Sequence, residues 1–542
     1  MLTLYPYQQK LFDLIISELK RSKRKRGIAV LPTGGGKTVV FSKIVELAQI
    51  KGSRSLILTD RAELLSETGN TLREFNLFPK YIVAGLKNPP TLEKGTTIVA
   101  MAQTLNRRIG RAGWDQFFAD IDLIIIDECH KQDFNDFFTS NIFDGRTLLG
   151  FSATPKRGSK QRQLGEDYDF IADTITVNEL IQLENLVPEL YYGVKGLTPD
   201  MKGVRKEKGD YSENQMFKKY DSPKIYGGVV KHWKEHHENT STLVFGVNIS
   251  HCIRLVKEFD KNGIKAKFLV SGKAKPKELP RPEPVREDAP PEWVKYWEQL
   301  DQYNEYKAAF DMYSGERTDL IERWKGKEFD VLINAGILTT GFNHKALESI
   351  YVVRATTSLI LWLQIIGRGS RTSPDKTHFN LVDFGGNAQR LGSYRLPRTW
   401  SLWHEGESST GGDAPMKVCG EDLPPDKHGK YGCGDFIFAS STICPICGYI
   451  YPEKKLEKEA ELTLMSFGAD GSQREVKPIR EMDYKELETF AKSQNYKSGW
   501  LFIQLARRGG EKEIKKYAEF KGYAPGWITR TVSRIPKHLL KD

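Results

Sequence analysis

A glycine-rich stretch near the start of the chain has the residue types and spacing for phosphate chemistry. Residues 31–38 have the sequence LPTGGGKT and lie between a short apolar run and a helical pattern. Glycines let backbone N–H groups approach phosphate oxygens, the following helix N terminus adds positive charge, and the Lys-Thr pair can reach outer phosphates and ligate Mg2+. Leu31 replaces the usual first glycine of such loops, so an ordinary Gly-rich turn is the alternative. The predicted nucleotide contacts are Thr33, Gly34, Gly35, Gly36, Lys37 and Thr38.

A second stretch supplies the carboxylates that such a site needs. Residues 123–130 have the sequence LIIIDECH, an apolar run that ends in two acidic side chains. A fully buried parallel strand has this pattern, and ligands bind at the carboxyl ends of such strands. Asp127 would hold Mg2+, directly or through water, and Glu128 would polarise the attacking water as general base. A strand followed by an acidic cap is the alternative.

Three motifs in this order resemble those of superfamily 2 helicases with a DECH-type second motif. They are the Gly-Lys-Thr loop, the Asp-Glu-Cys-His segment and residues 152–155, SATP. The resemblance implies two tandem RecA-like α/β domains, each a parallel sheet flanked by helices, with ATP in the cleft between them. The hydroxyl residues of the third motif would contact the Asp-Glu pair and couple hydrolysis to that cleft.

Two later segments extend the resemblance. Residues 338–343, LTTGFN, resemble motif V, in which Gly341 and Asn343 match nucleotide contacts. Residues 364–371, QIIGRGSR, resemble motif VI, in which arginines contact the γ-phosphate. On a continuous helix Gln364, Arg368 and Arg371 would share one face. The resemblance further implies that Gln8, in the opening Pro-Tyr-Gln element, pairs with adenine.

The charge of the chain favours an acidic polymer as partner. The net charge is +11 over 542 residues, although an ordinary basic surface would give the same value. Residues 55–64 and 96–105 match the motifs Ia and Ib that hold a nucleic-acid backbone. The basic run at residues 20–26 is interpreted as a solvated helix end. The contacts implied by the resemblance are Arg61, Gln103, Thr104 and Arg107.

Four of the six cysteines lie close together in the sequence, with spacing C-x13-C-x10-C-x2-C. They are Cys419, Cys433, Cys444 and Cys447. The final CPICG segment is typical of a zinc knuckle, whose turn directs two thiolates at one tetrahedral ion. The first pair is widely spaced, so His428 could replace one cysteine. We therefore expect a structural Zn2+ site, with four free buried thiols as the alternative.

The end of the chain contains a short repeat with a period of 27 residues. Residues 490–500 and 517–527 each contain a helix, a Tyr, a tight turn and a Trp. Two copies make a small helical unit. Its aromatic side chains could stack on unpaired bases, but we favour Trp500 and Trp527 as its core.

The predicted order of domains follows from these motifs. We expect motor domain 1 at 1–160, a connector at 161–221, motor domain 2 at 222–395, a zinc module at 396–455 and a helical unit at 456–542. Six prolines and an aromatic-rich helix indicate an insertion at 273–313, either a partner- or DNA-facing appendage or a surface elaboration. The start of the chain is polar and aromatic, and no apolar run approaches ~18 residues, so neither a signal peptide nor a membrane span is expected.

Motor motifs, cysteine cluster and terminal repeat together resemble the bacterial RadD-type repair ATPases and their phage and plasmid relatives. This implies an ATP-dependent helicase or translocase, in a bacterial cytoplasm, that remodels single-stranded, forked or branched DNA in repair, recombination or replication. A single-strand-binding protein is a further implied partner. The alternatives are a DNA-stimulated ATPase adaptor that does not unwind, the motor subunit of a restriction system, and an RNA helicase, because motor motifs alone do not distinguish the sugars.

Overall fold

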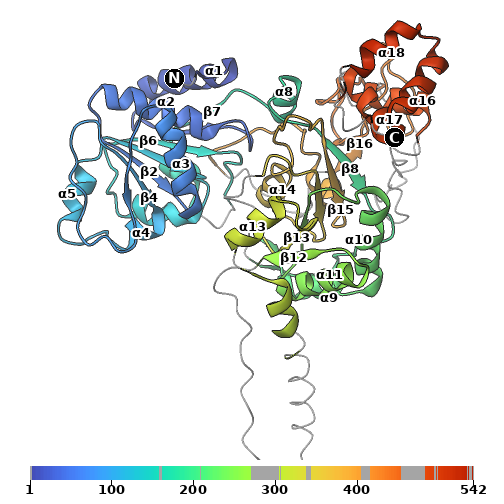
Figure 1. Cartoon of the computed structure of the whole chain (residues 1–542). Coiled ribbons are helices and arrows are strands. Elements are labelled where there is room, and N and C mark those ends of the chain that lie inside the picture. Colours follow the sequence, from blue (N-terminus) through green and yellow to red (C-terminus); the bar gives the residue numbers. More distant parts are fainter. Residues whose placement is uncertain are drawn as a thin grey trace, which may run out of the picture.

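The fold consists of two α/β domains, a small cysteine-containing module and a helical C-terminal unit (Figure 1). This architecture confirms the predicted fold class. The computed structural model describes residues 3–60, 62–157, 162–207, 209–269, 304, 307–315, 317–336, 338, 344–403, 415–452, 482–493, 496, 498–533, 535 and 540. None of the helices in these ranges is long and apolar enough to cross a membrane.

The first domain is built on a seven-stranded parallel sheet in the order β3-β4-β2-β5-β6-β1-β7. Strands β1, β2 and β5 are buried along their whole length, which indicates that helices cover both faces of the sheet. Because β6 lies between β1 and β5, the segments that follow these three strands meet at one edge. The strands are β1 (Arg26–Val30), β2 (Ser55–Thr59), β3 (Lys80–Ile82), β4 (Thr97–Met101), β5 (Leu123–Asp127), β6 (Thr147–Ser152) and β7 (Phe170–Asp173).

The helices of the first domain connect these strands and cover the sheet (Figure 1). They are α1 (Pro6–Arg21), α2 (Lys37–Ile50), α3 (Ala62–Glu74), α4 (Ala102–Asn106), α5 (Trp114–Ala119), the 3-10 turn η1 (Gln132–Phe134), α6 (Asn135–Thr139) and α7 (Leu164–Asp167). Residues of α1 and α2 form one apolar core against the sheet, and α5 with the α6 region forms the other.

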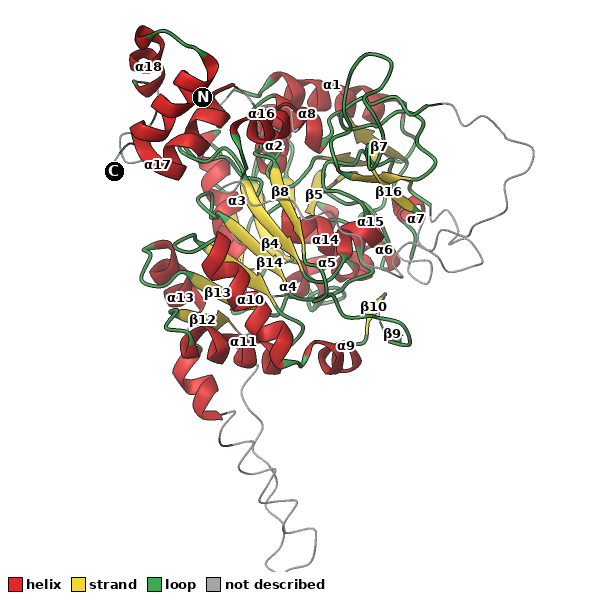
Figure 2. Cartoon of the chain, turned by 90° about the vertical axis from the view of Figure 1, so that its right-hand side faces the viewer, coloured by secondary structure: helices red, strands yellow, loops and turns green. Residues whose placement is uncertain are grey.

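The second domain repeats this plan with a six-stranded parallel sheet in the order β12-β13-β11-β14-β15-β8 (Figure 2). The strands are β8 (Glu189–Gly193), β11 (Thr242–Phe245), β12 (Ala266–Leu269), β13 (Val331–Asn334), β14 (Ser349–Val352) and β15 (Phe379–Asp383), with a separate hairpin of β9 (Lys206–Glu207) and β10 (Asp210–Tyr211). The helices are α9 (Glu213–Tyr220), α10 (Pro223–His236), α11 (Ile249–Lys261), α13 (Arg317–Lys325), α14 (Leu359–Ile366) and α15 (Asn387–Leu391), and α8 (Val177–Gln182) lies between the two domains in the chain.

The segment expected as a connector, residues 161–221, adds an edge strand to each sheet. Strand β7 pairs with β1 in the first domain, and β8 pairs with β15 in the second. Both strands are short and β7 is mostly half-exposed, so neither has the long apolar pattern of a central strand. The two motor domains are therefore joined by α8 and its flanking loops rather than by a long linker.

Two smaller units follow the motor domains. The cysteine module contains a hairpin of β16 (Met416–Val418) and β17 (Phe436–Phe438). The C-terminal unit contains α16 (Tyr484–Ser493), α17 (Ser498–Lys521) and α18 (Pro525–Val532), and α17 is interrupted by non-helical backbone at Gly509 and Gly510.

Most of the predicted insertion at 273–313 lies outside the described residues. Its final helical residues, 307–313, pack on the second domain. The Tyr313 hydroxyl donates to Asp260 Oδ2 at 2.7 Å, and Phe310 lies in the same apolar core. This end of the segment is therefore part of the domain itself.

Candidate functional site

The glycine loop connects β1 to α2 and has the backbone geometry of an anion site. Gly34 and Gly36 have φ values of 88° and 84°, in the left-handed region that favours glycine. Helix α2 begins at Lys37, so its first backbone N–H groups have no partner within the helix and face the loop. A Cβ atom on Gly36 would lie 2.3 Å from Gln8 Nε2, which is a second reason for glycine there.

The carboxylates predicted from the sequence lie beside this loop. Lys37 Nζ contacts Glu128 Oε1 at 2.8 Å, and both side chains are largely buried. Burial and the Glu128 charge raise the pKa of Asp127. Burial alone would also raise the pKa of Glu128, but the Lys37 ammonium holds that pKa below its usual value. The Lys37 ammonium thus favours the ionised form of Glu128, which a general base requires.

A chain of polar contacts joins these carboxylates to the third motif. His130 Nδ1 lies 2.8 Å from Ser152 Oγ and 3.5 Å from Glu128 Oε2. Ser152 Oγ also accepts from the Thr154 backbone N–H at 2.9 Å. Burial lowers the pKa of His130 to about 4, so its ring is neutral at pH 7. The expected contact between the hydroxyl motif and the Asp-Glu pair is therefore made through His130.

A buried arginine that the sequence did not single out fixes the same segment from behind. Arg157 donates to the carbonyl oxygens of Cys129 at 3.0 Å and His130 at 3.2 Å. Its other nitrogen lies 3.3 Å from Asp167 Oδ2, and both side chains of this pair are 1% exposed. The backbone that follows the carboxylates is consequently held in one position.

Gln8 is buried against the glycine loop. Its Nε2 donates to the Gly35 carbonyl at 3.2 Å, and its Oε1 accepts from the Tyr5 backbone N–H at 3.0 Å. The Tyr7 hydroxyl donates to the same Gly35 carbonyl at 3.1 Å. The Tyr5 ring is 58% exposed and stacks on Tyr7 with centroids 5.9 Å apart. Gln8 and Tyr7 therefore position the loop, and Tyr5 offers a free aromatic face beside it.

The helix expected over residues 364–371 ends early. Helix α14 stops at Ile366, so Gln364 lies on the helix while Arg368 and Arg371 follow in a turn and a β-bridge. A Cβ atom on Gly367 would lie 2.6 Å from Thr33 Cβ. The expectation of one shared helix face is wrong, because the chain turns where it meets the glycine loop.

This turn brings motif VI of the second domain to the glycine loop of the first. Arg371 forms an antiparallel bridge with Leu186, and the Val187 N–H donates to the Ser370 carbonyl at 2.7 Å. A Cβ atom on Gly34 would lie 2.8 Å from Leu186 Cδ2 and 3.6 Å from Arg371 Cγ. Burial lowers the pKa of Arg371. An arginine therefore faces the phosphate-binding loop across the cleft.

Residues 177–187 form a strap over the site that sequence reasoning missed. Leu180 is fully buried, and its Cδ1 would contact a Cβ atom on Gly35 at 3.5 Å. Asn178 Nδ2 donates to the Ile446 carbonyl at 3.3 Å, between two cysteines of the cluster. The strap thus contacts the glycine loop, motif VI and the cysteine module.

Three of the four residues expected to hold a nucleic-acid backbone lie on or directly after α4. Gln103 is exposed and donates to Asp133 Oδ1 at 3.2 Å, Thr104 is half-buried, and Arg107 is exposed. The neighbouring Arg108 is instead buried over the Trp114 ring, 4.8 Å from its centroid. Arg61, Gly341 and Asn343 lie outside the described residues.

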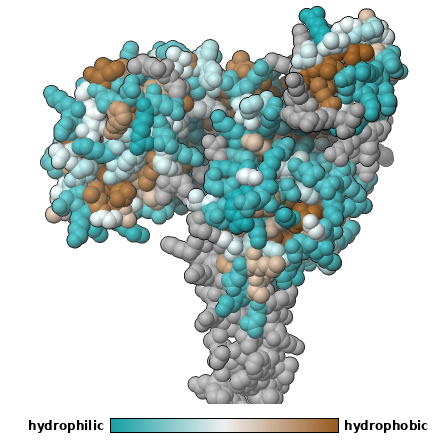
Figure 3. All heavy atoms as spheres, in the orientation of Figure 1, coloured by the Kyte–Doolittle hydropathy of each residue, from teal (hydrophilic) through white to brown (hydrophobic). Residues whose placement is uncertain are grey.

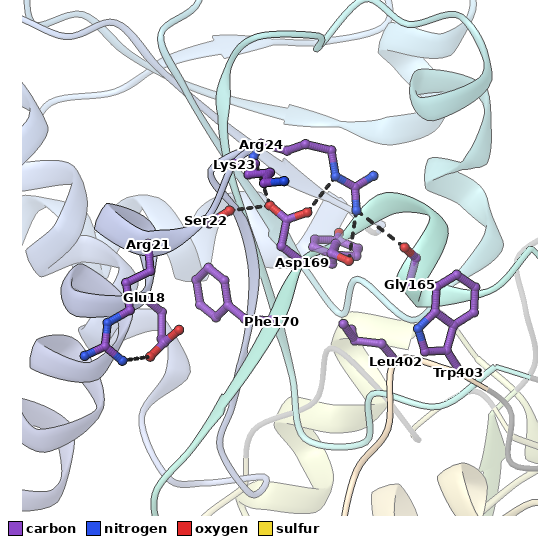
Figure 4. Close-up of a pocket in the computed structure, with 11 residues that line it drawn as sticks. Glu18, Arg21, Ser22, Lys23, Arg24, Gly165, Asp169, Phe170, Leu402 and Trp403 are labelled. Atoms are coloured by element: carbon purple, nitrogen blue, oxygen red, sulfur yellow. Dashed lines mark hydrogen bonds and ion pairs between the residues drawn. The ribbon is translucent and has the colours of Figure 1, made fainter.

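Residues 21–24 of the basic run line a cavity of about 440 Å³ (Figure 4). Arg24 points toward Asp169, with Nε–Oδ1 at 2.6 Å, and donates to the Glu166 carbonyl at 2.8 Å. Arg26 pairs with Asp144 at 2.9 Å. These contacts attach the start of β1 to the α7 region and to the loop before β6, so these two arginines have structural partners.

The four predicted cysteines form one cluster. Their Sγ atoms all lie within 4.8 Å of one another, with Cys419 and Cys447 at 3.8 Å and Cys433 and Cys444 at 3.9 Å. Four thiolates around Zn2+ at ~2.3 Å in a tetrahedron are about 3.8 Å apart, so the geometry fits that ion. Within the described part of the chain, the cluster contains these four thiols, and His428 lies outside it.

Comparison with known protein families agrees with this geometry. Residues 1–157 match the family described as "Type III restriction enzyme, res subunit". This region contains the glycine loop, the carboxylates and the third motif. It is a superfamily 2 helicase-like domain.

Three relatives illustrate the similarity. The protein named "Putative ATP-dependent helicase IRC3" of Saccharomyces cerevisiae is 29% identical over 410 residues, which cover 72% of this chain and 52% of the relative. The "51.5 kDa protein" of a Lactococcus phage is 26% identical, over 80% of this chain and 81% of its own length. The "DNA 3'-5' translocase XPB2" of Sulfurisphaera tokodaii is 28% identical over 26% of this chain and 30% of its own length. The chain thus spans about half the length of the yeast relative.

Proposed function

We propose that the protein is an ATP-dependent DNA helicase or translocase that remodels forked or branched DNA in repair, recombination or replication. The observation that carries the proposal is the approach of Arg371, from the second domain, to a glycine loop whose Lys37 contacts Glu128 in the first. A site divided between two domains can couple the state of the nucleotide to their relative position.

In this proposal ATP binds with its phosphates in the glycine loop. Lys37 moves from Glu128 to the outer phosphates, and Glu128 then polarises the attacking water. Arg368 and Arg371 stabilise the charge that develops on the γ-phosphate, and Gln364 belongs to the same motif. The Thr38 hydroxyl and Asp127 are hard oxygen ligands suited to Mg2+, which neutralises phosphate charge when bound.

Closing and opening of the cleft would move the two domains along a strand. Residues on the first domain that match backbone contacts include Gln103, Thr104 and Arg107. Such contacts are to phosphates, so binding is expected to be sensitive to salt and nearly independent of sequence. The net charge of +11 and the relative named as a DNA translocase support DNA as the polymer.

The finer assignment to RadD-type repair ATPases is part of this proposal. It rests on the four-thiol module and the helical repeat that follow the motor domains. The match of residues 1–157 to a restriction-enzyme family favours a second candidate, the motor subunit of a restriction system. That candidate requires a nuclease partner, and its ATP turnover would depend on that partner.

The proposal is tested by the ATPase rate with a panel of polymers: none, single-stranded DNA, duplex DNA, forked or branched DNA, and RNA. We expect the strongest stimulation with forked or branched DNA. Stimulation by RNA alone would overturn the choice of DNA. If no polymer stimulates turnover, a partner-dependent motor becomes the better interpretation.

We further propose that the four-thiol cluster holds one structural Zn2+ ion. The Cys447 N–H points to Cys444 Sγ at 3.5 Å, a contact that stabilises a thiolate in a knuckle turn. With four protein ligands the ion has no open position for chemistry.

Replacing Cys433 by Ser is expected to lower the zinc content from about one ion per chain to nearly none. Three thiols cannot complete the tetrahedron, so the remaining cysteines become reactive toward a thiol reagent. Elemental analysis of the purified full chain measures the first effect, and thiol titration measures the second. Cys252→Ala, at a buried cysteine of the second domain, is the matched control and should keep its zinc. A wild-type chain without zinc would contradict the assignment.

A further inference from the structure

The C-terminal unit contains the same aromatic pair twice, in two different surroundings. Tyr496 and Trp500 have ring centroids 4.6 Å apart at 33°, and Tyr523 and Trp527 have centroids 4.3 Å apart at 36°. The two pairs are equivalent positions of the sequence repeat, with a period of 27 residues. Because their internal geometry is nearly the same, any difference in exposure reflects what each pair packs against.

The first pair is a contact with the second motor domain. Trp500 is only 3% exposed, and its ring centroid lies 6.4 Å from that of His378, which precedes β15. Phe490 packs on the other side of the pair, 5.9 Å from Trp500. This copy therefore confirms the expectation that Trp500 is a core residue.

The second pair is more exposed than the first: Tyr523 lies at the surface, while Trp527 is half-buried and packs against the apolar core of the unit. Tyr523 is 39% exposed, and Phe520 beside it is 48% exposed. Both rings lie over Tyr517, which is 3% exposed, with centroids 6.4 Å and 6.5 Å from it. Trp527 lies 6.4 Å from the same buried ring. We call Phe520, Tyr523 and Trp527 the aromatic face, and its rings are supported from below by Tyr517.

Basic side chains flank the aromatic face. Residues 512–530 contain five basic and two acidic side chains. Lys516 is 68% exposed, with its Nζ 3.7 Å from Glu513 Oε2, and lies one helical turn before Phe520 on α17. The exposed Arg530 lies one turn after Trp527 on α18. Figure 3 shows apolar side chains on the surface of the C-terminal unit among hydrophilic ones. Exposed aromatic rings that lie between positive charges suit a ligand that carries both negative charges and planar rings.

We propose that the aromatic face binds single-stranded DNA. Bases stack on Phe520 and Tyr523, and the ammonium of Lys516 and the guanidinium of Arg530 contact phosphates. Aromatic rings stack on any unpaired base and so need no sequence preference, whereas a duplex hides its bases. This inference rests on the proposed function as a DNA motor and adds a second contact point to it. The first copy of the repeat attaches the unit to the motor, and the second holds a strand.

The test uses the full chain and a labelled oligothymidine, with a duplex of equal length for comparison. The Phe520→Ala/Tyr523→Ala double variant should bind the single strand at least about 30-fold more weakly, because stacking on two rings is lost. Its affinity for the duplex should change little. Tyr431→Ala, at a 58% exposed tyrosine of the cysteine module, is the matched control and should bind as the wild type does.

A second pair of variants tests the phosphate contacts without disturbing packing. Lys516→Gln and Arg530→Gln should each reduce the slope of log affinity against log salt concentration by about 0.7 for the single strand. Both side chains are exposed, so the melting temperature should stay at the wild-type value.

The outcomes separate this inference from the proposed function. If the wild type binds neither polymer, the proposed DNA motor fails. If the wild type binds the single strand and neither the aromatic nor the charge variants weaken it, the aromatic face is not the site. Docking of a protein on this face would give that second result.

Discussion

The Glu128→Gln variant is expected to bind ATP and to hydrolyse it about 10²- to 10⁴-fold more slowly than the wild type. Glu128 lies at the end of a buried strand, and the adjacent Lys37 ammonium, 2.8 Å away, holds the pKa of its carboxyl low. A glutamine keeps the shape of the side chain but cannot take a proton from water. Phosphate release at saturating ATP and DNA measures the rate, and a fluorescent ATP analogue measures binding.

A glutamate far from the site provides the control for this result. Glu93 is exposed on the loop before β4, and Glu93→Gln should hydrolyse ATP at the wild-type rate. Loss of ATP binding in Glu128→Gln would indicate that the side chain organises the loop rather than the water. Turnover at the wild-type rate in Glu128→Gln would remove the carboxylate from its proposed role.

The arrangement of the segments at the candidate site follows from local sequence patterns. The glycine loop must follow a buried strand and begin a helix, and residues 27–38 contain that whole arrangement. The run before Asp127 is apolar without alternation, as a strand buried on both faces must be. Parallel sheets place the ends of such strands at one edge, so Lys37 and Glu128 could be expected to meet.

What the sequence did not predict depends on contacts between distant segments. Helix α14 has apolar residues up to Ile366, and nothing local shows that Gly367 must turn because Thr33 lies against it. Strand β14 has only four residues, and no strand is predicted there from the sequence. The helix of the strap at residues 177–187 has only one fully buried residue, Leu180, so its sequence has no strong apolar pattern. Its position becomes clear only from its contacts, such as the hydrogen bond from Asn178 to the cysteine module.

The strap also relates the cysteine cluster to the nucleotide site. Ile446 lies between two of the clustered cysteines, and its carbonyl accepts from Asn178. Eight residues after Asn178, Leu186 packs on Gly34 and forms a β-bridge with Arg371. The strap therefore contacts both the cysteine module and Arg371, so one short segment links the two.

The second large effect is expected for Arg371→Ala, which should lower the ATP hydrolysis rate about 10³- to 10⁵-fold while ATP still binds. The side chain reaches the glycine loop from the other domain, with Cγ 3.6 Å from where a Gly34 Cβ would lie, so it can act on charge that develops at the γ-phosphate. Arg371→Lys keeps the charge but loses the planar fork, and should recover only a small part of the rate.

Arg323→Ala, on the exposed face of α13, is the matched control and should hydrolyse ATP at the wild-type rate. Single-turnover hydrolysis with forked DNA separates the chemical step from binding. If Arg371→Ala hydrolyses ATP at a rate within tenfold of the wild type, this arginine does not stabilise the charge on the γ-phosphate.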